Sequence, residues 1–178
     1  MRRQGSGTLV YISSTTSHLA EPFMAPYIAS KAAGEALAEV FGLEVAPFGV
    51  DTVIVVPGEF NQGTEHFAHL SGPGDRATVA QYGALSSRSN DIHDRLAQID
   101  AANEDGPADV RSVGAALVDV LRTQRGKRPR RLIVDPQHKG VEELDTVRAE
   151  KQQQFFTQLG VADLLKVSIR PSPYEETA

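Results

Sequence analysis

Two apolar runs separated by a segment of helical length constrain the fold of this chain most strongly. Residues 8–13 (Thr-Leu-Val-Tyr-Ile-Ser) and residues 50–56 (Val-Asp-Thr-Val-Ile-Val-Val) are β-branched and apolar, with little polar alternation. Such runs are typical of strands that are covered on both faces, as in a parallel sheet. Residues 26–46 begin with Pro26 and are rich in Ala, Leu and Glu, which predicts a helix. A strand, a helix and a second strand form a βαβ unit, which is parallel and right-handed in nearly all proteins.

The rest of the chain continues this alternation. We expect a weaker helix over about 76–100, broken at 103–107, an amphipathic helix over 108–122, a strand over 132–135 and a helix over 142–159. The polar, glycine-containing loop 59–75 starts a lid segment that covers about 59–105. The sequence thus predicts one α/β domain over residues 1–178, with three parallel strands and flanking helices in a Rossmann-like, doubly wound sheet. In the last helix, Phe155, Phe156 and Leu159 are expected to pack against the sheet.

Composition excludes several classes of function. A net charge of −5 argues against a partner that is nucleic acid or an acidic membrane, and the basic run Arg125–Arg131 is interpreted as a solvated loop. The chain has no cysteine, which excludes disulfides and thiol catalysis. His66 and His69 lack a third ligand at helical spacing, so no metal is expected. No apolar run approaches the roughly 20 residues of a membrane span, and the expected location is the cytoplasm.

Three side chains near the start of the chain form a candidate proton-transfer set. Ser14 follows the first strand, Tyr27 comes thirteen positions later at the start of the helix, and Lys31 is four residues further. Positions i and i+4 share a helix face, and an ammonium beside a phenol favours its ionised form. Tyr27 could then act as a general acid or base on a carbonyl or alcohol whose oxygen is held by Ser14. The alternatives without a catalytic role are a Tyr-x-x-x-Lys pair that arises by chance and a serine that caps a loop.

The stretches Gly7–Ser14, Tyr27-Ile-Ala-Ser-Lys31 and Val50–Gly58 together resemble the short-chain dehydrogenase/reductase family, from its fifth strand to its C-terminal end. The resemblance implies an NAD(P)-dependent oxidoreductase in which Ser14 polarises the substrate oxygen and Tyr27 transfers its proton. It also implies that Lys31 binds the nicotinamide ribose and that the backbone at Pro57 and Gly58 meets the nicotinamide carboxamide.

The resemblance is less specific beyond Gly58. Many members carry a threonine about five residues after the proline, but Gln62 stands there and Thr64 lies two positions further on. Thr64 is therefore a tentative cofactor contact. Phe60 and Phe67 could line a substrate pocket or serve only to pack the lid. NAD and NADP remain equally open as the cofactor, and a small alcohol or carbonyl compound is the expected substrate.

The family's glycine-rich cofactor turn has no counterpart in this sequence. Gly5-Ser-Gly7 precedes a strand instead of following one, and the turn must open a helix to bind pyrophosphate. The chain is therefore interpreted as the C-terminal portion of such an enzyme. Residues 8–13 are then expected to present an open apolar edge, so that the isolated chain would be marginally stable or dependent on a partner.

Three functions remain open from the sequence. The leading one is an oxidoreductase that interconverts an alcohol and a carbonyl by hydride transfer. The second is a non-catalytic remnant that acts only by oligomerising, since helix 26–46 builds a dimer interface in the family; a homo-oligomer through this helix is expected in either case. The third is an epimerase or dehydratase of the extended branch, which the compact C-terminal part disfavours.

Overall fold

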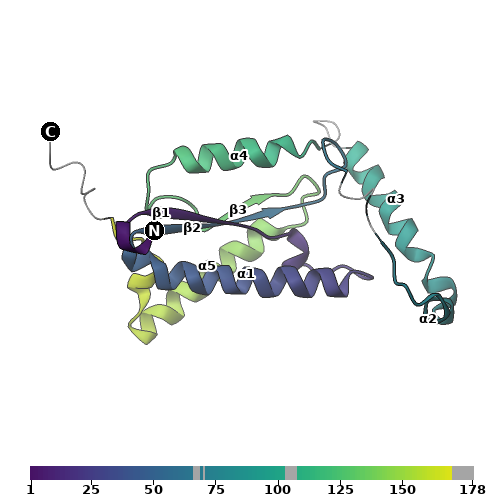
Figure 1. Ribbon diagram of the computed structural model, residues 1–178, viewed down its shortest axis with the longest axis horizontal. Coiled ribbons are helices and arrows are strands. Elements are labelled where there is room, and N and C mark those ends of the chain that lie inside the picture. Colours follow the sequence, from purple (N-terminus) through teal and green to yellow (C-terminus); the bar gives the residue numbers. More distant parts are fainter. Residues whose placement is uncertain (66–68, 70, 103–107, 170–178) are drawn as a thin grey trace.

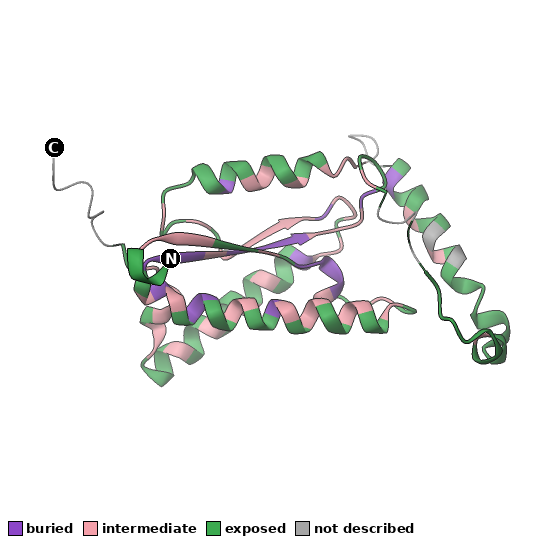
Figure 2. Ribbon diagram, viewed as in Figure 1, coloured by how far each residue is buried: buried purple, intermediate pink, exposed green. Residues whose placement is uncertain are grey.

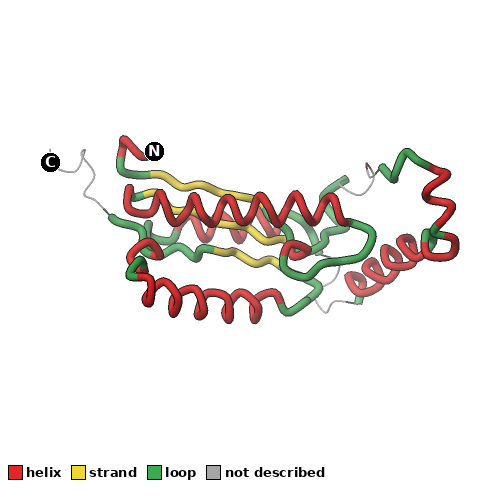
Figure 3. The backbone as a smooth tube through the Cα atoms, turned by 90° about the horizontal axis from the view of Figure 1, so that it is seen from below, coloured by secondary structure: helices red, strands yellow, loops and turns green. Residues whose placement is uncertain are grey.

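Three parallel strands form the single sheet of the computed structural model, which describes residues 1–65, 69, 71–102 and 108–169. Strands β1 (Gly7–Ile12), β2 (Val50–Pro57) and β3 (Arg131–Val134) lie side by side in the order β1-β2-β3 (Figure 3). Gly7 pairs with Val50 at one end of the sheet, and Pro57 pairs with Val134 at the other. The predicted βαβ unit and the parallel α/β fold are confirmed.

Helices cover both faces of this sheet. Helix α4 (Arg111–Arg122) lies on one face, and α1 (Ala25–Val45) and α5 (Val141–Leu159) lie on the other (Figure 1). The central strand β2 supplies the core, because its four residues from Val53 to Val56 are 0% exposed (Figure 2). Alternate side chains of a strand point to opposite faces. The α4 side of the core is Val53, Val55, Val113, Leu117, Val120 and Leu132, and the α1–α5 side is Tyr11, Ala38, Ile54, Val56, Ile133 and Val141.

The predicted helix over 76–100 is interrupted. The structure has α2 (Arg76–Gln81), a 3-10 turn (Gly83–Leu85) and α3 (Arg88–Ala101), which together extend away from the three-layered body (Figure 1). Gly83 has a φ of +53°, a left-handed conformation that glycine adopts without strain and that ends a regular helix. The next helix begins at Arg111 instead of 108. The predicted helix break at 103–107 lies outside the described residues.

The last helix leaves two of its three predicted packing residues exposed, while Phe156 is half-buried. Phe155 and Leu159 are each 55% exposed, so the prediction that they pack on the sheet is wrong. Helix α5 has 19 residues and β3 has four. At 1.5 Å and about 3.3 Å per residue, the helix is about 28 Å long and the strand about 13 Å. The C-terminal half of α5 therefore extends beyond the strand that its first turns cover.

The β1 strand lies at an edge of the sheet, as expected. Its side chains Leu9, Val10 and Ile12 are exposed, while β2 covers its other edge. An exposed apolar strand edge favours pairing with a further strand. Among the described helices, none has the length and apolarity that crossing a membrane requires.

Candidate functional site

The carboxyl ends of the three strands meet at one edge of the sheet. Ser13 and Ser14 follow β1, Gly58 follows β2 and Asp135 follows β3. The backbone joins these ends directly, since Ser13 N donates to Val55 O at 2.7 Å. Ser14 and Gly58 thus lie at the carboxyl edge of the sheet, and ligands of open α/β sheets bind outside this edge.

Lys31 connects the start of α1 to the end of β1. Its Nζ donates to Ile12 O at 3.0 Å and lies 5.8 Å from the centre of the Tyr27 ring. Tyr27 and Lys31 are both half-buried on the first two turns of the helix. The structure thus brings together the two members of the predicted set that share a helix face.

Ser14 is nearly buried and caps a turn. Its Oγ accepts hydrogen bonds from Thr16 N at 3.3 Å and from Thr16 Oγ1 at 3.0 Å, at the start of the 3-10 turn Thr15–Ser17. Within the described part of the chain, no hydrogen bond joins Ser14 to Tyr27. The capping role weighed for Ser14 is thus present in the structure, and both contacts leave the Ser14 hydroxyl as the acceptor.

Pro57 and Gly58 end the central strand and turn toward the lid. Gly58 N donates to Val134 O at 2.8 Å, which continues the pairing of β2 with β3 by one residue. A Cβ on Gly58 would lie 2.5 Å from Gln137 Oε1 and 2.7 Å from Asp135 Oδ1, so a larger residue here would displace the ends of these two side chains. In the lid, Phe60 is buried and Thr64 half-buried, and Phe67 lies outside the described residues.

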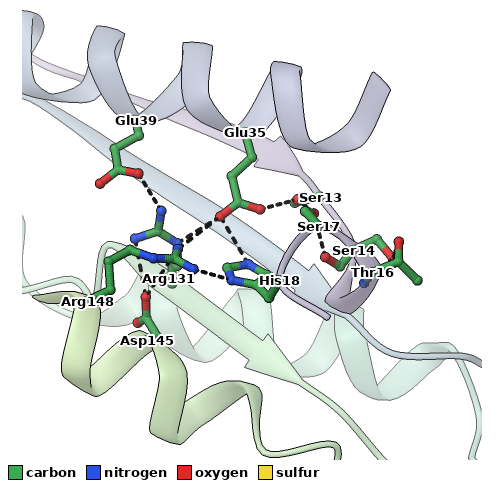
Figure 4. Close-up of polar contacts among 10 residues, drawn as sticks. All are labelled: Ser13, Ser14, Thr16, Ser17, His18, Glu35, Glu39, Arg131, Asp145 and Arg148. Carbon is green, nitrogen blue, oxygen red and sulfur yellow. Dashed lines mark hydrogen bonds and ion pairs between the residues drawn. The ribbon is translucent and has the colours of Figure 1, made fainter. Parts of the chain in front are cut away.

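A buried ion network beside the site was missed by the sequence analysis (Figure 4). Glu35 of α1 accepts a hydrogen bond from Ser13 Oγ, and its Oε1 lies 3.1 Å from His18 Nε2 and 2.9 Å from Arg131 Nε. Arg131 reaches Glu39 Oε2 at 2.6 Å and Asp145 Oδ1 at 3.3 Å. Arg148 of α5 completes the network, within 3.5 Å of Glu35 Oε1.

This network corrects the interpretation of the basic run 125–131 as a solvated loop. The side chain of Arg131 is 4% exposed, and Arg128 donates to Thr8 Oγ1 at 2.6 Å and to Leu121 O at 2.8 Å. The run leads into β3, which begins at Arg131. Arg131 reaches α1 and α5, and Arg128 reaches β1 and the end of α4. One sequence feature could have indicated that Glu35 lies near the candidate site: it is four residues after Lys31 and therefore on the same face of α1.

The network sets the ionisation of Glu35. Burial alone would raise its pKa, but hydrogen bonds from His18, Ser13 and Arg131 outweigh burial and lower the pKa to about 2. Burial also raises the pKa of Glu39, and the Arg131 charge and the Gln152 hydrogen bond reverse this to a net lowering. Both carboxylates are thus ionised at neutral pH, and the Ser13 hydroxyl next to Ser14 is fixed by one of them.

The residues present fit one end of a dinucleotide. Lys31 and the Pro57–Gly58 turn lie at the carboxyl edge, where a nicotinamide ring and its ribose would bind. A pyrophosphate needs a glycine-rich turn between a strand and a helix. In the segments that the structure describes, the connections that follow β1 and β3 carry no such turn.

Comparisons with known proteins agree on one family. The family model described as short chain dehydrogenase matches residues 1–71. An uncharacterized oxidoreductase, YusZ, of Bacillus subtilis is 29% identical over 85 residues, 46% of this chain and 30% of the relative. A 3-ketodihydrosphingosine reductase of Bacteroides thetaiotaomicron is 40% identical over 63 residues, 35% of this chain and 23% of the relative.

Two further matches extend this result. An NADPH-dependent 3-dehydrocapnine reductase of Ornithobacterium rhinotracheale is 28% identical over 93 residues, 52% of this chain and 32% of the relative. The crystal structure of a short-chain dehydrogenase from Streptomyces avermitilis superposes with a TM-score of 0.56 and 30% identity, over 89% of this chain and 53% of that structure. The match thus spans about half of the solved structure and less than a third of each curated relative. These matches support the interpretation of this chain as similar to part of the short-chain dehydrogenase/reductase fold.

Proposed function

We propose that this chain carries the proton-transfer side of an NAD(P)H-dependent reductase that interconverts a carbonyl compound and an alcohol. Tyr27 is the general acid that protonates the carbonyl oxygen, and Ser14 donates a hydrogen bond to the same oxygen. Lys31 orients the Tyr27 ring and faces the cofactor ribose, beside the Pro57–Gly58 turn. A nicotinamide cofactor, when bound, supplies the hydride.

The single observation that carries the proposal is the position of Lys31. Its Nζ is held by Ile12 O, at the carboxyl end of β1, and lies beside the Tyr27 ring. A cation is thereby fixed between the phenol and the strand end, where it stabilises negative charge that develops on the phenol oxygen. Ser14 Oγ accepts in its two contacts with Thr16, so its own proton can be donated to a substrate oxygen.

The names of the relatives support the reducing direction. Two of them are named as reductases, one a 3-ketodihydrosphingosine reductase and the other an NADPH-dependent 3-dehydrocapnine reductase. We therefore propose carbonyl reduction as the direction to assay first, with both NADH and NADPH. Assays with a panel of ketones would identify the small-molecule carbonyl substrate.

The test is turnover by the purified chain and by Tyr27→Phe. Loss of the phenol proton should lower kcat by about 100-fold or more, because a positioned general acid contributes about 10²–10⁴-fold. The Tyr82→Phe variant is the matched control, since Tyr82 is exposed on the segment between α2 and α3. Turnover retained in Tyr27→Phe would refute the role of Tyr27.

A second candidate is a non-catalytic chain that acts only by oligomerising. The observation that favours it is the apolar outer face of α1, where Leu37, Val40 and Phe41 are exposed. This face supports a homo-oligomer through helix 26–46 under either function. Calorimetric titration with NADH and NADPH separates the two functions: saturable micromolar binding supports the reductase, and the absence of binding supports the oligomerising chain.

A further inference from the structure

The turn that follows β3 contacts both halves of the candidate site. Residues 135–140 connect β3 to α5 and lie at the same sheet edge as Ser14 and Gly58. The turn is itself fixed, because Lys139 N donates to Asp135 Oδ2 at 2.6 Å and His138 N donates to Asp135 O at 3.1 Å. A rigid turn at this position can transmit its geometry to the segments it touches.

One contact is a side-chain amide that pairs with the backbone as a neighbouring strand would. Glu59 N donates to Gln137 Oε1 at 2.8 Å, and Gln137 Nε2 donates back to Glu59 O at 2.8 Å. The pairing of β2 with β3 ends at Pro57 and Val134, so the Gln137 amide adds two further hydrogen bonds beyond the last strand pair. Both backbone groups of Glu59 are thereby satisfied by one residue.

The same turn also lies close to Gly58. A Cβ there would collide with Gln137 Oε1 and with Asp135 Oδ1, and Gly58 N is held by Val134 O. Asp135 is itself buried, so it has little room to yield. The Pro57–Gly58–Glu59 backbone is therefore held by hydrogen bonds along its length, with the Gln137 and Asp135 side chains close beside Gly58.

A second contact from the turn reaches the segment that follows Ser14. Lys139 Nζ lies 2.8 Å from Glu21 Oε1 and 3.4 Å from Thr15 Oγ1. Thr15 is buried next to Ser14. One turn thus touches the backbone after β2 through Gln137 and the Ser14 segment through Lys139.

We propose that Gln137 is a positioning residue that fixes the Pro57–Gly58–Glu59 backbone at the cofactor edge, while Lys139 ties the same turn to the Ser14 segment. Gln137 acts through the backbone and touches neither substrate nor cofactor. Its effect on catalysis rests on the proposed function, in which this backbone meets the nicotinamide end. Holding both segments from one turn sets the distance between the cofactor side and the Ser14 hydroxyl that would orient the substrate oxygen, and hydride transfer depends on such positioning.

The first test needs no activity. Amide hydrogen exchange at Glu59 is measured by NMR in the full chain and in Gln137→Ala, Gln137→Glu and Gln158→Ala. Loss of one hydrogen bond should speed exchange at Glu59 roughly 3- to 10-fold in Gln137→Ala. Gln137→Glu keeps the acceptor for Glu59 N and should restore protection. Gln158, exposed on α5, is the matched control and should change nothing. Unchanged exchange in Gln137→Ala overturns the proposal.

The second test links the contact to the reaction. With NAD(P)H varied in the ketone assay, Gln137→Ala should raise KM for the cofactor about 10-fold and lower kcat less, while the melting temperature stays near that of Gln158→Ala. Faster exchange at Glu59 with an unchanged KM would overturn the positioning role while leaving the proposed function intact. A wild-type chain without turnover or cofactor binding refutes the proposed function alone, and the exchange data still decide whether Gln137 fixes the backbone.

Discussion

The two faces of α1 differ from those of an ordinary surface helix. The face that packs on the sheet carries two ionised residues, Glu35 and Glu39, and Glu35 is 5% exposed. The face that points away carries Leu37, Val40 and Phe41, with Leu37 59% exposed. A helix of a soluble domain normally buries its apolar stripe and solvates its charges. Here ion pairs lie on the inner face beside Ala38 and Leu43, and an apolar stripe stays exposed on the outer face.

This difference between the two faces separates the contacts that stabilise the fold from the surface that is exposed to a partner. Arg131 and Arg148 satisfy the inner carboxylates, so the inner face is complete within the described chain. Within the described residues the outer face stays exposed, and large exposed apolar patches mark interaction surfaces. The inner face should therefore respond to stability measurements, and the outer face to measurements of association.

The largest effect is expected from Arg131→Ala. This variant leaves Glu35 and Glu39 buried without their shared cation, and breaking a buried ion network costs about 3–5 kcal/mol. Urea denaturation followed by circular dichroism measures the loss. Arg122→Ala is the control, because the Arg122–Asp119 pair is exposed, and it should cost under about 0.5 kcal/mol. Equal losses in the two variants would show that the inner network does not hold α1.

The second largest effect is expected at low pH, which should reduce the contribution of the inner face of α1 to folding stability. The pKa of Glu35 is about 2 in the folded chain against an ordinary 4.5, so ionised Glu35 favours folding above about pH 4.5. That contribution is lost as the pH falls from about 4.5 to 2, a loss of roughly 2 kcal/mol after allowance for solvent screening. Glu35→Gln should flatten this pH dependence in denaturant titrations. Glu150→Gln, at an exposed glutamate of α5, should keep the wild-type slope.

A methyl group added on the inner face of α1 should reduce folding stability by a smaller amount. A Cβ on Gly34 would lie 2.0 Å from Tyr11 Oη, so Gly34→Ala should destabilise by about 1–3 kcal/mol. In α4, a Cβ on Gly114 has no atom within 4 Å, and Gly114→Ala should stabilise by about 0.5–1 kcal/mol. Thermal melts of the two variants would therefore shift in opposite directions. A shorter side chain in Tyr11→Leu should relieve the cost of Gly34→Ala, and an additive pair would contradict the clash.

The smallest effect on stability is expected on the outer face. Leu37→Glu should change the free energy of unfolding of the monomer by no more than about 0.5 kcal/mol, since the side chain is exposed. It should nevertheless shift sedimentation equilibrium from oligomer to monomer. Leu159→Glu, at a leucine of α5 with 55% exposure, is the matched control. Association that survives Leu37→Glu would place the oligomer interface elsewhere.

Periodicity predicted the strands and helices well, because burial imposes it locally. Residues 50–56 are a continuous apolar run and form the fully covered strand β2. Residues 113, 117 and 120 repeat at helical spacing and pack on it. The same reasoning failed for Phe155 and Leu159, since their exposure depends on how far α5 extends past β3. The predicted strand 132–135 and helix 142–159 already differ in length in this way, but the type and spacing of the apolar residues do not indicate which of them are buried.

The candidate site shows the same division. Tyr27 and Lys31 are four residues apart, and their proximity follows from helix geometry alone. Gln137 and Glu59 are 78 residues apart, and Glu35 and Arg131 are 96 apart. No local signal links such positions. They meet because parallel strands place their ends at one sheet edge and because each helix packs on its neighbour.

The sequence by itself thus determined the order of the elements, the parallel sheet and the candidate Tyr27–Lys31 pair. These follow from apolar periodicity within each element, from the helical length of the crossover and from an i, i+4 spacing. Only the tertiary structure decided which face of α1 is buried, how the basic run before β3 is used and which residue holds the turn after Pro57. The reason is physical: an ion pair or a backbone contact across the sheet is fixed by the packing of whole elements, and residue type alone does not specify its partner.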